Sequence, residues 1–203
     1  MNNAKSLHNG NPCEILARIG FEALAKMAEP TSADDGDSSH EDHARVATLL
    51  RQAEARENQY GSVFWLGRKI SWPERLPELV TWSGRQTLGK LIKKYQSALS
   101  VRVENLFTFT AALKGASGLD PLINLDPIDV GFSANGVGIE VQQRPAVELL
   151  AIYALDFTPV LSFGGGEYAI MEDMIEWRFG AEKRAGGYYS RWTFAQGREL
   201  TWR

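Results

Sequence analysis

The residues best suited to phosphate chemistry are 84–91, which read Gly-Arg-Gln-Thr-Leu-Gly-Lys-Leu. They contain both glycines and the lysine of the phosphate-binding loop G-x-x-x-x-G-K-[ST], whose last residue supplies a hydroxyl group to magnesium. Leu91 takes that last position, and a leucine side chain cannot coordinate a hard cation. We therefore expect the segment to begin a helix. A nucleotide-binding enzyme with a degenerate phosphate loop at 84–91 is the alternative.

Two other groups carry side chains used in metal binding or nucleophilic catalysis. His40-Glu41-Asp42-His43 offers imidazole and carboxylate ligands. It lies in a polar stretch, and its acids are more typical of a helix N-terminus, where the helix dipole favours them. Cys13 lies at a helix start with no basic residue nearby in sequence, so we expect it to be buried as a small apolar side chain. We predict no enzyme activity, no metal site and no cofactor.

Basic residues interleaved with aromatic ones could bind nucleic acid, because cations neutralise phosphates and rings stack on bases. They occur on the predicted helix around Lys90 and in the C-terminal part of the chain. The candidate nucleic-acid-binding residues are Arg85, Lys90, Lys93, Lys94, Arg184, Tyr189 and Arg191. In the competing interpretation, the C-terminal rings form the core of a sheet and the cations keep its outer side hydrated.

Composition limits the kind of protein. The chain has 203 residues, 44% of them hydrophobic, which is enough for one domain over 1–203 with a sizeable core. A formal net charge of -3 gives no attraction to nucleic acid over the whole surface, so such contacts must come from local patches. The acidic, Ser- and Gly-containing stretch 29–42 should be a mobile loop. With no apolar run of about 18 residues, we expect a cytoplasmic protein with no membrane partner.

Apolar residues at helical spacing predict helices at 12–28, 43–57, 83–100 and 144–157. Residues 62–72 favour β structure, whereas 101–114 fit either a strand or a buried helix, and we expect a short strand at 128–132. From 160 to 202, glycine-separated apolar and aromatic runs predict an antiparallel β-meander. The predicted fold class is α+β, with several helices packed against a C-terminal antiparallel β-meander.

One sequence pattern occurs twice, at 12–21 (PCEILARIGF) and at 146–155 (AVELLAIYAL). Each copy has Glu, two aliphatic residues, Ala, two variable positions, a small residue and a large apolar one, with a proline before it and another after it. The shared residues are apolar or small apart from the glutamate. The pattern therefore indicates two related packing helices, which we expect at opposite ends of one fold, the second central and buried.

Residues 11–25 resemble the opening NP-x-x-x-L-A-x-x-G-h-x-x-L-A of large-subunit-like and accessory proteins encoded beside type I-G (formerly I-U) CRISPR effector genes. Residues 129–133 followed by 144–151 are similar to the second half of that pattern. The resemblance implies a non-enzymatic component of an RNA-guided antiviral interference complex. Its partners would be other CRISPR effector subunits, with crRNA or target DNA as further ligands. An unrelated cytoplasmic structural or interaction protein is the remaining alternative.

Overall fold

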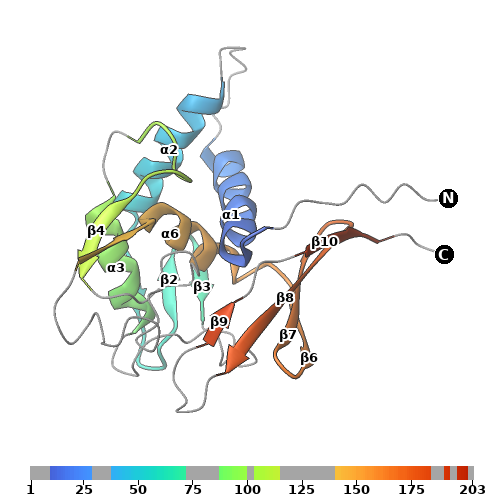
Figure 1. Cartoon of the computed structure of the whole chain (residues 1–203). Helices are drawn as coiled ribbons and strands as arrows, with labels where there is room; N and C mark the ends of the chain where they lie inside the picture. Colours follow the sequence, from blue (N-terminus) through green and yellow to red (C-terminus); the bar gives the residue numbers. More distant parts are fainter. Residues whose placement is uncertain are drawn as a thin grey trace.

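The structure, a computed structural model, combines helices with antiparallel sheets and belongs to the α+β class (Figure 1). The residues that it describes are 10–28, 38–71, 87–99, 103–114, 140–183, 190–192 and 196–200. The helices lie together on one side of the molecule, and the C-terminal sheet lies on the other (Figure 1). Buried apolar side chains from the helices, from a hairpin at 63–70 and from the C-terminal sheet form one continuous core.

Helix α1, Pro12–Ala28, has the predicted bounds. Its first turn is fixed by Asn11, whose side-chain oxygen accepts a hydrogen bond from the Cys13 amide at 2.9 Å. Proline follows at the first helical position, where its missing amide hydrogen leaves no bond unmade. Glu14, which the sequence pattern would direct back to the cap, forms an ion pair with Arg144.

Helix α2, Ser38–Gln52, begins before the end of the predicted acidic loop, so 38–42 are helical and 29–37 lie outside the described residues. The prediction that a helix continues to residue 57 is wrong. The Gln96 side chain donates hydrogen bonds to the backbone oxygens of Leu50 and Ala53, at 2.7 and 2.8 Å. These carbonyls therefore have a partner where the helix ends and do not need a further helical turn. The chain can then leave the helix and enter strand β1, Arg56–Glu57.

Strands β2, Val63–Trp65, and β3, Arg68–Ile70, form a hairpin that pairs with β1 in the order β1-β2-β3. The two residues between β2 and β3, Leu66 and Gly67, both have positive φ angles (50° and 75°), as a tight hairpin turn requires. The β structure predicted for 62–72 is therefore confirmed over its described residues.

Helix α3, Leu88–Ala98, starts later than predicted, at the cap residue Thr87, and 83–86 lie outside the described part of the chain. The ambiguous segment 101–114 becomes strand β4 only at Ala111–Lys114, paired with β5, Glu140–Gln143. Before it, the Asn105 side chain accepts a hydrogen bond from the Phe107 amide at 2.8 Å and forms a turn. The strand expected at 128–132 also lies outside the described residues.

Helix α6, Pro145–Ala154, is buried at all ten positions, which confirms the prediction of a central helix. The expectation that it lies at the opposite end of the fold from α1 is wrong, since the two helices pack directly together (Figure 1). A Cβ atom on Gly20 of α1 would lie 2.3 Å from the Leu150 carbonyl oxygen of α6. Because glycine has no Cβ, the backbones of α1 and α6 can come this close at Gly20.

The C-terminal sheet has the order β10-β8-β7-β6, and β9 also pairs with β8. Its strands are β6, Val160–Gly164; β7, Glu167–Glu172; β8, Ile175–Lys183; β9, Ser190–Trp192; and β10, Gln196–Glu199. All pairings are antiparallel, and the predicted C-terminal antiparallel sheet is confirmed. Its inner face meets α1, where Arg18 lies over the Trp177 ring and pairs with Glu172 at 2.5 Å.

Candidate interaction surface

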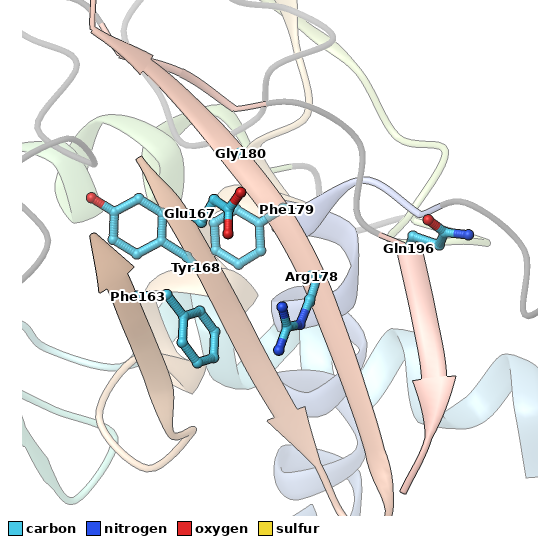
Figure 2. A pocket seen from close by; sticks show the side chains of 7 residues that line it. All are labelled: Phe163, Glu167, Tyr168, Arg178, Phe179, Gly180 and Gln196. Carbon is cyan, nitrogen blue, oxygen red and sulfur yellow. The ribbon is translucent and has the colours of Figure 1, made fainter. Parts of the chain in front are cut away.

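The outer face of the C-terminal sheet, on the side away from α1, carries an open pocket of about 320 Å³ (Figure 2). The residues that line it are Phe163, Glu167, Tyr168, Arg178, Phe179, Gly180 and Gln196. They come from β6, β7, β8 and β10, and two of them, Tyr168 and Phe179, belong to the buried core. A cross-strand row, Leu161, Ala169, Arg178 and Gln196, runs across the same strands from β6 to β10. Side chains in such a row point to the same face of the sheet. We call this region the outer sheet face.

A shared carboxylate organises the charges of the outer sheet face. One Glu176 oxygen accepts hydrogen bonds from Arg178 at 2.6 Å and from Arg198 at 2.8 Å, so a single acid holds two guanidinium groups. Burial by itself would raise the pKa of Glu176, but the two arginines outweigh it and keep the pKa below its ordinary value. The two arginines carry one positive charge more than Glu176 neutralises, and Glu167, which also lines the pocket, offsets it.

Apolar side chains on the same face are exposed. Leu161 and Phe163 of β6 keep 45% and 49% of their surface, and the Arg178 guanidinium lies 4.7 Å from the centre of the Phe163 ring. Among the described strands, β6 pairs only with β7, so it is an edge strand. Monomeric proteins usually protect such edges with charges, prolines or bulges, because an exposed apolar edge invites another chain.

The lysines predicted for nucleic-acid contact do not all face solvent. Lys90 and Lys93 are exposed on α3. Lys94 is half-buried, and its amine donates to the Gln143 side chain at 3.5 Å. Desolvation lowers the Lys94 pKa, and the negative charge of Glu148 opposes this only in part. The exposed basic side of α3 therefore consists of Lys90 and Lys93.

The other predicted residues are only partly described. Arg85, Arg184 and Tyr189 lie outside the described residues. Arg191 is on β9, opposite Glu182 of β8 in the strand register. The structure thus brings Lys90 and Lys93 together on one helix, whereas Arg191 belongs to the C-terminal sheet.

At the start of α3, the described residues of the degenerate phosphate loop lie beside the Glu57 carboxylate. Thr87 accepts a hydrogen bond from the Lys90 amide at 3.3 Å and donates its own hydroxyl to Glu57 at 2.9 Å. The Glu57 carboxylate also lies 2.8 Å from where a Cβ atom on Gly89 would be. A phosphate bound at this helix end would therefore lie beside a negative charge, which the loop in nucleotide-binding proteins does not present.

His43 and Cys13 have packing contacts. The His43 ring stacks on Phe21 with centroids 4.7 Å apart, and its Nδ1 accepts a hydrogen bond from the Leu106 amide at 3.4 Å. Cys13 is fully buried, as predicted. Within the described ranges, no cluster of three or more His, Cys, Asp or Glu side chains could hold a metal ion.

Two exposed aromatic residues, Phe64 and Phe163, are not among the site residues predicted from the sequence. The alternation of Val63, Phe64 and Trp65 is a signal that could have found the first, since their side chains point alternately into the core and out of it. Phe163 has no comparable signal, because a register irregularity in β6 separates it from the simple alternation of its neighbours.

Comparisons with family models, curated protein sequences and solved structures found no match to this chain. None of the described helices has the length and apolar character needed to cross a membrane.

Proposed function

We propose that the chain is a non-enzymatic subunit of a type I-G CRISPR interference complex, which it joins through the outer sheet face. The observation that carries the proposal is the exposed edge strand β6, with Leu161 and Phe163 beside the arginines held by Glu176. Aromatic and arginine side chains are enriched at protein interfaces, and an edge strand can pair with a strand of another chain. The resemblance of 11–25 and 144–151 to CRISPR accessory proteins supports the choice of complex.

The repeated pattern supports a scaffolding role. Its apolar positions are core in both copies, and its two glutamates are next to cations: Glu14 pairs with Arg144, and Glu148 acts electrostatically on Lys94. The Glu14–Arg144 ion pair links α1 to the residue that precedes α6. The residues that define the resemblance are thus used for packing, so recognition of partners falls to the surface.

A nucleic-acid contact is the second part of the proposal. Lys90 and Lys93, one helical turn apart on the exposed side of α3, would meet the phosphate backbone of crRNA or target DNA. Replacing both with glutamine should reduce the slope of log K against log[salt] by about 1.4 for a single strand, at about 0.7 per phosphate contact. An unchanged slope would remove them from the interface.

Affinity purification from the native host tests the assembly. The tagged chain should recover other CRISPR effector subunits, and the double change Leu161→Asp and Phe163→Asp should reduce their recovery because it places charge on the proposed contact. Phe64→Ala removes a comparably exposed aromatic from another sheet and should leave recovery unchanged. Failure of the unaltered chain to recover any effector subunit would contradict the proposal.

A further inference from the structure

A second exposed aromatic, Phe64, lies on the β1-β2-β3 sheet rather than on the C-terminal one. It keeps 56% of its surface, although Val63 and Trp65 on either side are fully buried. No ring or cation contact to Phe64 is found among the described residues, and a side chain with this exposure can meet a ligand.

The strand register places a cation on each side of this ring. Arg56 of β1 and Lys69 of β3 are the direct cross-strand neighbours of Phe64, and both are exposed. Direct neighbours have Cβ atoms about 4.5–5.5 Å apart and point to the same face. Arg56, Phe64 and Lys69 therefore form one row, cation, ring, cation, across all three strands.

Helix α3, which carries the exposed Lys93, packs against β1 beside this row. The Glu54 carboxylate accepts two hydrogen bonds from Arg56, at 3.0 and 2.7 Å. These bonds lower the Glu54 pKa most, and the charge of Lys93 lowers it further, so Lys93 lies within electrostatic reach of the same carboxylate. We call Lys93, Arg56, Phe64 and Lys69 the Phe64 strip. It carries three cations against the one acid, Glu54, that is paired within it.

Glu54, the acid within the strip, does not prevent an anion from binding there. Arg56 and Glu54 keep 74% and 69% of their side-chain surface, and water and salt screen an exposed pair of this kind. Arg56 can therefore exchange Glu54 for a phosphate at little cost. Glu57, the other nearby acid, is engaged by the Thr87 hydroxyl at the start of α3.

We propose that the Phe64 strip binds single-stranded nucleic acid, with a base stacked on the Phe64 ring and phosphates on Arg56, Lys69 and Lys93. A ring between cations fits this ligand, because the bases supply flat faces and the backbone supplies regularly spaced negative charges. Double-stranded DNA fits less well, since its bases are stacked on each other and offer no open face. The inference rests on the nucleic-acid part of the proposed function and adds a base-contacting residue to it.

Fluorescence anisotropy with the full chain tests the strip, using labelled oligothymidine and oligouridine of about 20 nucleotides, longer than the site size of one single-strand-binding module. Phe64→Ala should weaken binding at least about fivefold, whereas Phe64→Trp should retain it. Lys69→Gln should reduce the salt slope by about 0.7. Phe163→Ala removes a ring of similar exposure, 49% against 56%, from the other sheet; it is the matched control and should bind single strands as the unaltered chain does.

Each alternative outcome is informative. Equal binding by Phe64→Ala and the unaltered chain would show attraction to any polyanion and overturn the strip, as would stronger binding to poly-glutamate or to a duplex than to either single strand. The ratio of the two oligonucleotide affinities distinguishes DNA from RNA as the source. Because the assay uses the isolated chain, its failure would leave the recovery of effector subunits through the outer sheet face untouched.

Discussion

At the scale of single residues, Gly20 decides whether the two repeated helices can meet. An added methyl group would lie 2.3 Å from a backbone oxygen of α6, and a backbone atom cannot rotate away as a side chain can. Gly20→Ala should therefore lower the free energy of unfolding by about 1–3 kcal/mol or more, although alanine favours helices. Urea unfolding followed by circular dichroism measures the change.

Gly89→Ala is the matched control, because it makes the same substitution in helix α3. There the nearest atom is the end of the Glu57 side chain, at 2.8 Å, which can move. The cost of displacing the Glu57 side chain and the gain of about 1 kcal/mol in helix propensity should largely cancel, so the free energy of unfolding should change little. Equal destabilisation by Gly20→Ala and Gly89→Ala would show that the close backbone approach of α1 and α6 does not limit the residue at position 20.

Arg68 joins the β2–β3 hairpin to the end of α6. Its guanidinium donates to the Tyr153 hydroxyl at 3.2 Å and to Asp156 at 3.1 Å, and it lies 4.7 Å from the centre of the Phe157 ring. Lysine keeps the charge but loses the planar group that serves all three contacts. Arg68→Lys should cost about 1 kcal/mol of stability, whereas Arg56→Lys, at an exposed pair, should cost almost nothing. Thermal unfolding of both variants would separate these outcomes.

Glu176 predicts a pH dependence. Its pKa is lower in the folded protein than in the unfolded chain because Arg178 and Arg198 stabilise the carboxylate. This contribution is therefore fully present above the unfolded pKa, near 4.5, and is lost as the pH falls through the folded value. The unaltered chain should exceed Glu176→Gln in stability at neutral pH, and the difference should shrink below about pH 4.5. A constant difference measured by denaturant titration across this range would show that the carboxylate does not hold the arginines.

At the scale of elements, the sequence was most informative where structure is local. The start of α1 follows from Asn11 and Pro12, and the turn before β7 follows from Gly164, Gly165 and Gly166, all with positive φ angles. The end of α2 was not predictable in this way. It depends on Gln96, a residue more than forty positions away, bonding the last carbonyls.

Distance along the chain also explains what was missed in the candidate sites. The spacing of Lys94 places it away from the apolar stripe of α3, but Gln143 and Glu148 come from β5 and α6 and draw its amine inward. The Phe64 strip likewise depends on pairing between strands, which no single segment records. Exposed aromatic residues became recognisable as candidates only when their neighbours were known.

At the scale of the whole molecule, the two proposed surfaces lie on separate sheets and should act independently. The outer sheet face belongs to β6, β7, β8 and β10, whereas the Phe64 strip belongs to β1, β2, β3 and α3. Phe64→Ala should lose affinity for single strands but retain protein partners, and Phe163→Asp should do the reverse. Parallel loss of both activities in either variant would indicate general unfolding, which circular dichroism would reveal.

Reconstitution with purified effector subunits tests the central proposal most directly. In size-exclusion chromatography, the unaltered chain and Phe64→Ala should elute with the other subunits of a type I-G complex at a fixed stoichiometry, and the Leu161→Asp, Phe163→Asp double variant should elute alone. If the double variant joins the complex as well as the unaltered chain does, the outer sheet face is not the contact. If the unaltered chain itself elutes alone, the assignment to this complex is wrong.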